Sequence, residues 1–364
     1  MTFQKTMLAL FVGASVMAMA PASALAAPVA QTVKAEKPNV YILATGGTIA
    51  GSAASNTKMT GYKAGALGVQ TLLNAVPEIN NFANCQGEQI SNIGSESMTV
   101  EIWLKLANRV NELLARPDVD GIVITHGTDT LEETAYFLNL VVKSKKPVVI
   151  IGAMRPATAI SADGPVNILN AVKLAASRDA QNRGVMVAMN DTINGARDVQ
   201  KTNTLRVDTF MSPELGYLGY FEGGNPVFYK QSTKKHTAAT EFDVKGLKEL
   251  PRVDIVYSHV NDDGLMVEAA VKNGAKGIVH AGTGNGSIAA ATEPALYKAA
   301  KQGVVIVRGA RVPNGPTIES TAAWDEAGFV HAGTLSPQKA RILLQLALTK
   351  TTDLKEIERM FKTY

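Results

Sequence analysis

The chain alternates short apolar runs with segments of helical periodicity. The runs at 39–44 (NVYILA), 121–125 (GIVIT), 147–153 and 185–189 are almost wholly apolar. Strands that are buried on both faces of a parallel sheet have this composition. Helical patterns lie between some of these runs, for example at 102–114. This alternation predicts an α/β domain that is built on a parallel sheet.

The helix expected after GIVIT has a clear start signal. Thr130 is followed three residues later by Glu133, which is the sequence pattern of a capping box. Apolar residues then recur at helical spacing from 131 to 141. We therefore expect the Thr130 side chain to cap this helix.

The segment from about 228 to 251 has a different character. It is polar and basic (QSTKKHTAATEFD) with weak periodicity, and we interpret it as a linker or a long crossing loop. A second series of strands and helices follows, and one of its helices opens with Ser336 as the expected N-cap and Pro337 in the first turn. The expected elements of this series lie at 253–257, 265–273, 277–280, 304–307, 336–350 and 354–361.

These patterns together predict an α/β protein of two domains. A larger N-terminal parallel-sheet α/β domain occupies 38–229, a linker 230–251, and a smaller C-terminal α/β domain 252–364. After removal of a leader, the chain has enough residues for one large or two medium domains.

The first 26 residues have the features of a secretory signal peptide. Lys5 precedes an apolar run at 7–20, and the triplet Ala24-Leu25-Ala26 provides an A-x-A cleavage site. The run is too short to span a bilayer, so a membrane anchor is the weaker interpretation. We expect cleavage near Ala26 and a periplasmic product.

Composition excludes several classes of function. Hydrophobic residues make up 46% and charged residues 19%, as in ordinary globular proteins. The net charge of +4 is mild and no block of basic residues occurs, which argues against nucleic-acid and membrane partners. Cys85 is the single cysteine, so no intramolecular disulfide can form. The five histidines are scattered without metal-ligand spacing, so we expect no metal and no cofactor.

Two Gly- and Thr-rich turns follow predicted strands. The first is 45–50 (TGGTIA) and the second is 126–130 (HGTDT). Ligands of open α/β sheets bind at the carboxyl ends of the strands, where these turns lie. The first turn alone is equally well explained as a tight strand exit. The second carries more polar side chains than helix capping requires, which favours a ligand role.

Other polar segments widen this candidate site. Ser95 and Glu96 precede the helix at 102–114, where capping by Ser97 or Thr99 is the simpler explanation. Lys201 follows a charged segment at 190–198; such clusters are commonly solvated loops, yet a lysine of lowered pKa beside a threonine could act as a base. A Gly-rich loop at 282–287 lacks the spacing of a dinucleotide-binding motif.

These residue types fit a small zwitterionic ligand. Carboxylates can hold an amino group, while hydroxyls and main-chain N–H groups can hold a carboxylate. A hydrolase with a hydroxyl nucleophile and a periplasmic amino-acid-binding protein without catalysis both satisfy this pattern. Spacing alone leaves both open.

The same segments resemble the bacterial L-asparaginase family, in particular its periplasmic type II branch with the glutaminase-asparaginases. The similarity extends from about 39 to 364. The segments that carry it are ILATGGTIA (42–50), GIVITHGTDTL (121–131), MRPATAISADGPVN (154–167), MND (189–191), ARDV (196–199), KTNT (201–204), GTGNG (282–286) and LSPQKARILLQLAL (335–348).

The resemblance implies a mechanism without metal or cofactor. Thr48 would attack the amide carbon of asparagine or glutamine and form an acyl-enzyme, although the order of attack by the threonines is open within the family. Tyr62 would lie on a mobile lid and hydrogen-bond Thr48. Thr128, Asp129 and Lys201 would form a second polar triad.

The resemblance also implies how the substrate is held. Asp129 would bind the α-ammonium group and Ser95 the α-carboxylate, and main-chain groups near Thr128 and Ala153 would stabilise the oxyanion. A glutamate at the position of Glu96 resembles the dual-specificity enzymes, whereas the strict asparaginases have glutamine there.

The family site is completed across a subunit boundary in a homotetramer. Asn285 matches one of the two contributing residues. The other, a glutamate, is expected near Ala322, where this chain has no acid; Glu319 or Glu326 could replace it after a local shift.

Overall fold

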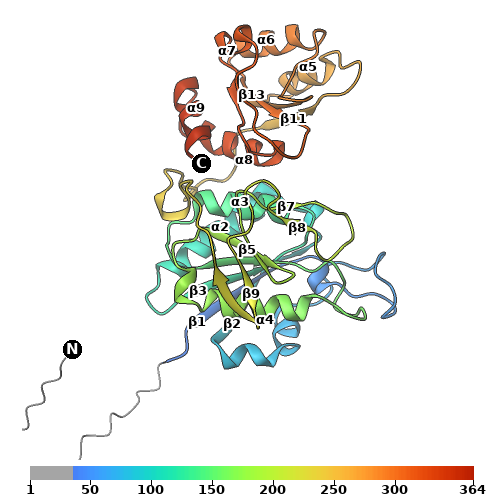
Figure 1. Ribbon diagram of the computed structural model, residues 1–364, viewed down its shortest axis with the longest axis vertical. Coiled ribbons are helices and arrows are strands. Elements are labelled where there is room, and N and C mark those ends of the chain that lie inside the picture. The colour runs from blue at the N-terminus through green and yellow to red at the C-terminus, as the bar shows by residue number, and fades with distance from the viewer. Residues whose placement is uncertain (1–35) are drawn as a thin grey trace, which may run out of the picture. The chain divides into compact units, whose positions relative to one another are not determined.

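The computed structural model describes residues 36–364 (Figure 1). The predicted signal peptide, 1–26, lies outside the described residues. Among residues 36–364, no helix combines the length and the apolar character needed to cross a bilayer.

The first sheet has eight strands in the order β10-β9-β6-β5-β4-β3-β1-β2. The half from β2 to β5 is parallel, which confirms the predicted parallel-sheet α/β domain. The half from β6 to β10 is antiparallel and was not predicted. The strands are β1 (Asn39–Gly46), β2 (Asn84–Ile93), β3 (Gly121–Thr125), β4 (Val148–Ile151), β5 (Val185–Met189), β6 (Thr192–Gly195), β9 (Gly219–Glu222) and β10 (Asn225–Phe228).

Helices cover both faces of this sheet because side chains alternate along each strand. In β1, Val40 and Ile42 belong to the core beneath α1 (Val69–Asn74) and α4 (Gly164–Ala175). Tyr41 and Leu43 point the other way, into the core that includes α2 (Val100–Ala115) and α3 (Leu131–Val141). The nearly continuous apolar runs therefore predicted the central strands correctly.

The second sheet is parallel throughout, in the order β11-β12-β13-β14. One face packs against α5 and α6, and the other against α8. Its elements are β11 (Val253–Tyr257), α5 (Leu265–Lys272), β12 (Gly277–Gly282), α6 (Glu293–Lys301), β13 (Val305–Ala310), α7 (Ala322–Glu326), β14 (Val330–His331), α8 (Pro337–Leu348) and α9 (Leu354–Thr363). The smaller C-terminal α/β domain is thus confirmed as a fold, while the boundaries at 229 and 252 stay predictions.

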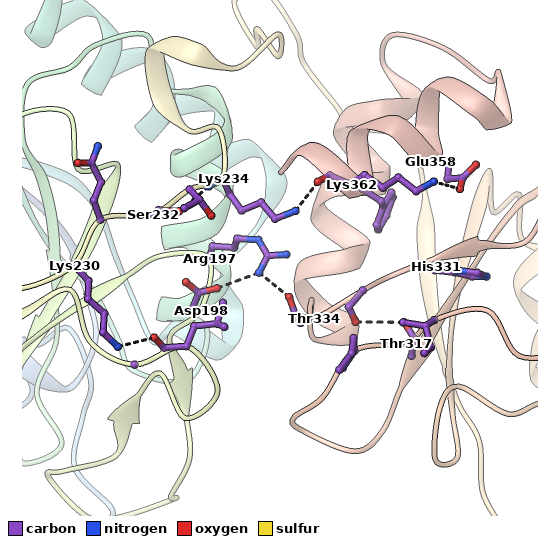
Figure 2. Close-up of a pocket in the computed structure, with 18 of the residues that line it drawn as sticks. Arg197, Asp198, Lys230, Ser232, Lys234, Thr317, His331, Thr334, Glu358 and Lys362 are labelled. Carbon is purple, nitrogen blue, oxygen red and sulfur yellow. Dashed lines mark hydrogen bonds and ion pairs between the residues drawn. The ribbon is translucent and has the colours of Figure 1, made fainter.

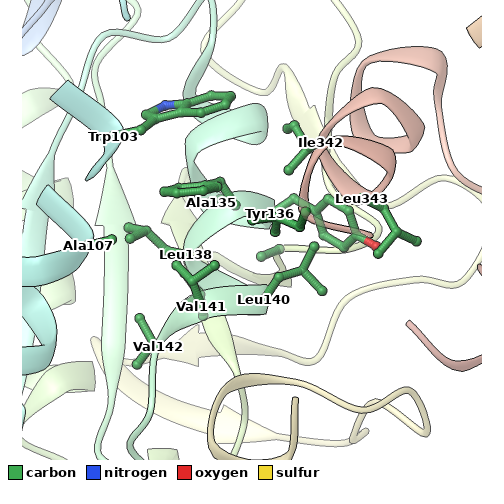
Figure 3. Packing of buried hydrophobic residues seen from close by; sticks show 14 of the residues in the cluster. Trp103, Ala107, Ala135, Tyr136, Leu138, Leu140, Val141, Val142, Ile342 and Leu343 are labelled. Atoms are coloured by element: carbon green, nitrogen blue, oxygen red, sulfur yellow. The ribbon is translucent and has the colours of Figure 1, made fainter. Parts of the chain in front are cut away.

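One hydrophobic core extends across both sheets. It contains the outer face of α3, with Tyr136 and Leu140, and the inner face of α8, with Ile342 and Leu343 (Figure 3). It continues into the second sheet through Val279 and neighbouring strand residues. Helix α3, which follows the second polar turn, is therefore packed directly against α8.

The expected helix caps are only partly observed. Thr99 caps α2 by accepting a hydrogen bond from the N–H of Ile102 at 3.3 Å. Thr130 stands at the N-cap of α3 but makes no capping hydrogen bond, so the predicted capping box is wrong. Its hydroxyl instead donates to the carbonyl oxygen of Ser95 at 2.8 Å. Ser336 likewise occupies the N-cap of α8 without a side-chain cap bond.

The strand order creates a crevice beside β1. The chain passes from β1 to one neighbour, β2, and then returns to the other neighbour, β3. The connections therefore leave β1 in opposite directions, and such a switch point opens a crevice at the carboxyl ends of the strands. The turns at 45–50 and 126–130 follow β1 and β3, so the fold places both of them here.

Candidate active site at the switch point

Two glycines allow the turns after β1 and β3 to touch backbone to backbone. Gly47 has φ 81°, and a Cβ atom built on it would lie 2.2 Å from the Cα atom of Gly127. A Cβ built on Gly127 would in turn lie 2.6 Å from Ser95 Oγ. Any larger residue would force the turns apart. The three polar segments singled out from the sequence therefore meet at one place.

Replacement of Gly47 by alanine is expected to separate these turns. The new Cβ meets main-chain atoms, which cannot rotate away, so we expect a loss of stability above about 2 kcal/mol together with loss of activity. Gly246→Ala is the matched control, because Gly246 also has φ 81° but has no atom within 4 Å of its Cβ position. Its cost is the left-handed backbone alone, roughly 1–2 kcal/mol. Equal unfolding free energies and activities for the two variants would contradict this account.

Thr48 lies just beyond the two glycines, in the 3-10 turn Thr48–Ala50. Its side chain is buried, with 8% exposure, and its hydroxyl is 2.6 Å from that of Tyr62. The Tyr62 ring lies against Gly51, where a Cβ would approach Cδ2 to 2.9 Å. An antiparallel bridge between Ser52 and Lys63 closes the loop that carries Tyr62. The structure thus brings together the predicted nucleophile and the predicted lid tyrosine.

A second polar group faces the crevice from the turn after β3. Lys201 Nζ lies 2.9 Å from Thr128 Oγ1 and 2.5 Å from Asp129 Oδ1. Lys201 comes from a two-residue strand, β7 (Gln200–Lys201), which pairs with β8 (Phe210–Met211). Thr128 is buried, whereas the Asp129 side chain is 60% exposed. The three residues predicted to act as a triad are therefore in contact.

The segment after β2 completes the crevice. Ser95 is buried, and its Oγ accepts a hydrogen bond from the Asp129 N–H at 3.0 Å. Glu96 is exposed, and its carboxylate folds back over Gly94, where a Cβ would approach Oε1 to 2.2 Å. Ser95 is thus hydrogen-bonded to the second turn, while the side chain of Glu96 is exposed and accessible to a ligand.

His126 serves the structure of the turn. The ring is fully buried, with Nδ1 2.7 Å from the Gly127 carbonyl oxygen and Nε2 2.9 Å from Thr134 Oγ1. The indole N–H of Trp103 donates to the same Thr134 oxygen at 2.7 Å, so the threonine is free to donate to Nε2. This arrangement fits a neutral ring that carries its proton on Nδ1. Burial lowers the pKa of His126 to about 4.

The buried ring makes stability sensitive to acid. The pKa of His126 is about 4 in the folded chain and about 6.5 when unfolded, so its contribution is complete above pH 6.5 and is lost as the pH falls toward 4. Between about pH 7 and about pH 4.5 the wild type should lose roughly 2–3 kcal/mol more than His126→Gln. Denaturant unfolding at both pH values measures the difference. Parallel losses in the two proteins would show that His126 is not the responsible group.

Asn285 lies away from these turns within the described chain. Its Oδ1 accepts from the Ile318 N–H at 2.9 Å, and its main-chain oxygen accepts from Arg308. Glu319 follows Ile318 directly and is exposed, whereas Glu326 ends α7. Ala322 begins α7, so no acid stands at the position where the family resemblance places the glutamate that completes the partner's site. Among residues 36–364, the hydrogen bonds of Asn285 go to Ile318 and Arg308 and none goes to Thr48 or Thr128.

Two cavities flank the segment that carries Lys201. One of about 430 Å³ is lined by Asp129 and 201–204, beside the crevice. A larger one, of about 780 Å³, lies between Arg197 and the C-terminal elements (Figure 2). Two pairs of its charged side chains, Arg197–Asp198 and Lys362–Glu358, form salt bridges, and Arg197 also donates to Thr334. We place the site at the smaller cavity because Asp129 of the second turn and its partner Lys201 line it. No cluster of potential metal ligands occurs among residues 36–364.

The sequence did not single out the residues that hold Lys201 in place. The Lys201 N–H donates to Glu132 Oε2 at 2.6 Å, and Gln338 Nε2 donates to Glu132 Oε1 at 2.6 Å. Lys339 Nζ donates to the carbonyl oxygens of Arg197 at 2.9 Å and Val199 at 2.5 Å. The only available signal was a charged residue, Lys339, inside the apolar pattern of α8.

Comparison with known proteins identifies the family. Residues 39–234 match the model "Asparaginase, N-terminal", and residues 252–361 match "Glutaminase/Asparaginase C-terminal domain". The chain belongs to the asparaginase family. The predicted resemblance is confirmed, and so is the α/β fold class.

Curated members of the asparaginase family are similar over most of the chain. L-asparaginase 2 of Bacillus subtilis (strain 168) is 54% identical, covering 91% of this chain and 88% of that protein. A probable periplasmic L-asparaginase of Haemophilus influenzae is 52% identical (91% and 94%), and a glutaminase-asparaginase of Pseudomonas fluorescens biotype A is 49% identical (91% and 92%).

A solved asparaginase structure has the same fold. The crystal structure of a probable cytoplasmic L-asparaginase from Campylobacter jejuni superposes with a TM-score of 0.88 at 51% identity, covering 90% of this chain and 100% of that one. The chain is thus an amidohydrolase of the asparaginase family, as predicted.

Proposed function

We propose that this asparaginase-family chain hydrolyses the side-chain amides of L-asparagine and L-glutamine with Thr48 as nucleophile. The observation that carries the proposal is the Thr48 hydroxyl, 2.6 Å from the Tyr62 hydroxyl in the crevice at the switch point. Relatives named L-asparaginase and glutaminase-asparaginase support both substrates. No metal or cofactor is required by this chemistry.

The reaction proceeds in two steps. Thr48 Oγ1 attacks the amide carbon, and its proton is relayed through the Tyr62 hydroxyl, which accepts it and passes its own proton on toward the departing nitrogen, while the carbonyl oxygen becomes negatively charged. Main-chain donors near Thr128 and Ala153 stabilise this oxyanion. Collapse of the intermediate expels ammonia, which takes up a proton, and leaves an acyl ester on Thr48. Water then hydrolyses the ester, restores the hydroxyl and releases aspartate or glutamate.

The second polar group holds and polarises the substrate. The Asp129 carboxylate, 60% exposed, binds the α-ammonium group, and Ser95 binds the α-carboxylate. Lys201, which contacts Thr128 and Asp129, keeps Thr128 oriented toward the amide and assists proton movement.

A second subunit completes the site in a homotetramer. In this proposal Asn285, whose Oδ1 accepts from the Ile318 N–H of its own chain, contributes to the crevice of a partner, as the family resemblance implies. Of the two candidate acids, Glu319 is preferred because it is exposed and follows Ile318 directly, whereas Glu326 lies at the end of α7.

The proposed compartment is the periplasm. The pattern of residues 1–26 and the H. influenzae relative named as periplasmic support it. The C. jejuni structure bears a cytoplasmic name. Cell fractionation and the N-terminal sequence of the mature protein decide the point: the mature chain should begin close after Ala26.

An ammonia assay separates the enzyme from the alternative of a periplasmic amino-acid-binding protein. Purified wild type should release ammonia from both amides with multiple turnovers. A binding protein would instead retain asparagine or glutamine stoichiometrically and release no ammonia. Absence of ammonia from both substrates would end the proposal.

Glu96 is expected to set the balance between the two amides. Glu96→Gln should lower the ratio of kcat/KM for glutamine to that for asparagine, by roughly three- to tenfold, which corresponds to loss of one favourable charged contact. Glu101→Gln, in the first turn of α2, is the control because Glu101 is also exposed. An unchanged ratio in Glu96→Gln would remove Glu96 from the specificity argument.

A further inference from the structure

Lys201 stands on a weak structural element. Its strand β7 has two residues and pairs with the two residues of β8 in an isolated ribbon. An isolated two-stranded ribbon is marginally stable by itself. The position of Lys201 must therefore be fixed by contacts from outside the ribbon.

Glu132 provides such a contact from beneath the catalytic turn. It lies in the first turn of α3, two residues after Thr130, and is 6% exposed. Each of its two oxygens accepts one hydrogen bond of 2.6 Å, from the Lys201 N–H and from Gln338 Nε2. A buried carboxylate is costly unless its lone pairs are satisfied, so both partners are held tightly.

Both ends of Lys201 are thereby attached to one rigid unit. Its ammonium group reaches Thr128 and Asp129 in the turn, and its main-chain N–H reaches Glu132 at the start of the helix that continues this turn. The side chain spans a fixed distance between these two points. A shift of the ribbon would break one attachment or the other.

Helix α8, in the C-terminal domain, secures the other side of the segment. Lys339, adjacent to Gln338, is 1% exposed and donates to the carbonyl oxygens of Arg197 and Val199. Arg197 also donates to Thr334 (Figure 2). Its Nε donates to the main-chain oxygen of Tyr364. Residues 197–201 are thus bound by the C-terminal part of the same chain.

We propose that Glu132, held by Gln338, is a positioning residue that fixes Lys201 against Thr128 and Asp129 through its hydrogen bond to the Lys201 main chain. The role rests on the proposed amide hydrolysis. It makes helix α8 of the same chain a contributor to catalytic geometry, without any contact to substrate.

A pair of substitutions separates positioning from charge. Glu132→Met removes both acceptors at similar volume, so Lys201 should shift and kcat should fall roughly 10- to 100-fold, as misplacement of a catalytic group by about 1 Å does. KM should change less than about threefold. Glu132→Gln keeps an acceptor for the Lys201 N–H, and Gln338 can turn its amide to match; kcat should return to within about threefold of wild type.

The matched control is Glu133→Met, on the same turn of α3. Glu133 is half-buried and makes no hydrogen bond to the Lys201 segment, so kcat should stay within about twofold of wild type. If Glu132→Met fails to fold, Gln338→Met provides an alternative test of the positioning role. It removes only the donor to Oε1 and should lower kcat roughly three- to tenfold.

The outcomes are distinguishable. Wild-type kcat in folded Glu132→Met, or in Gln338→Met where Glu132→Met does not fold, would overturn the positioning role. An equal loss of kcat in Glu132→Gln, or in Glu133→Met, would also overturn it, because charge or general helix damage would then explain the effect. Failure of the wild type to release ammonia would overturn the proposed function instead.

Discussion

Replacing Thr48 with alanine is expected to lower kcat for both amides by at least about a thousandfold, because the variant has no hydroxyl to form the acyl ester. That loss corresponds to roughly 4 kcal/mol or more of transition-state stabilisation. Steady-state ammonia release, with asparagine and glutamine in parallel, measures it. KM should change much less than kcat in the same experiment, because Asp129 and Ser95, which are proposed to bind the substrate, are left intact.

Two variants frame this result. Thr48→Ser restores a hydroxyl at the same place and should recover activity to within about tenfold of the wild type. Thr71→Ala, an exposed threonine of α1, should behave as wild type. If Thr48→Ala retained most of its activity, another residue would be the nucleophile, and Thr128 would be the next to test.

Lys201→Met is expected to produce the second largest loss, roughly 100- to 1,000-fold in kcat. The substitution keeps the length of the side chain but removes the ammonium group that contacts Thr128 Oγ1 at 2.9 Å and Asp129 Oδ1 at 2.5 Å. It also leaves the Asp129 carboxylate, which is proposed to bind the α-ammonium group of the substrate, without its ion-pair partner. The loss corresponds to roughly 3–4 kcal/mol.

The measurement again is kcat and KM for both amides. Lys272→Met, at the exposed end of α5, serves as control for the loss of a lysine. If kcat of Lys201→Met were within about fivefold of the wild-type value, Lys201 would only balance the charge of Asp129 and would not stabilise the transition state. That result would also remove the basis for a positioning role of Glu132.

Strands buried on both faces were the features best predicted from sequence. The predicted strands at 121–125 and 185–189 coincide with β3 and β5, whose residues are all buried. The partly exposed edge strand β11 also coincides with its predicted range, 253–257. Strand β2 was missed because it lies at the edge of the sheet and most of its side chains are at least partly exposed, so its sequence, NCQGEQISNI, has no apolar run. The antiparallel half of the sheet was missed because its strands β6, β9 and β10 are short (TING, GYFE and NPVF) and, unlike β4, have no continuous apolar run that is fully buried.

Part of the site could be predicted from the turns themselves. Local composition marked 45–50 and 126–130, and the strand order brings them together. Lys201 was suggested by its residue type, whereas Tyr62 and Asn285 entered only through the family resemblance. The catalytic roles of all these residues stay predictions.

Long-range contacts set the limit of the sequence reasoning. Glu132 looks like an ordinary acid in the first turn of a helix, and nothing local indicates that Lys201 and Gln338 will share its carboxylate. The capping box failed for a related reason: the Thr130 side chain is turned to donate to the carbonyl oxygen of Ser95, a partner 35 residues away, and accepts no hydrogen bond from the first turn of α3. A local rule cannot anticipate a competitor that arrives through tertiary folding.

The core shared by α3 and α8 constrains the order in which the molecule can be assembled. Helix α3 ends at residue 141 and α8 begins at residue 337. During synthesis, the apolar outer face of α3 is therefore complete long before α8, the helix that packs against it. At about 5–20 residues per second, the intervening chain of roughly 200 residues takes about 10–40 seconds to synthesise. The turn with Thr128 and Asp129 leads directly into α3. The catalytic half of the molecule therefore cannot reach its final packing until the last residues of the chain have been made.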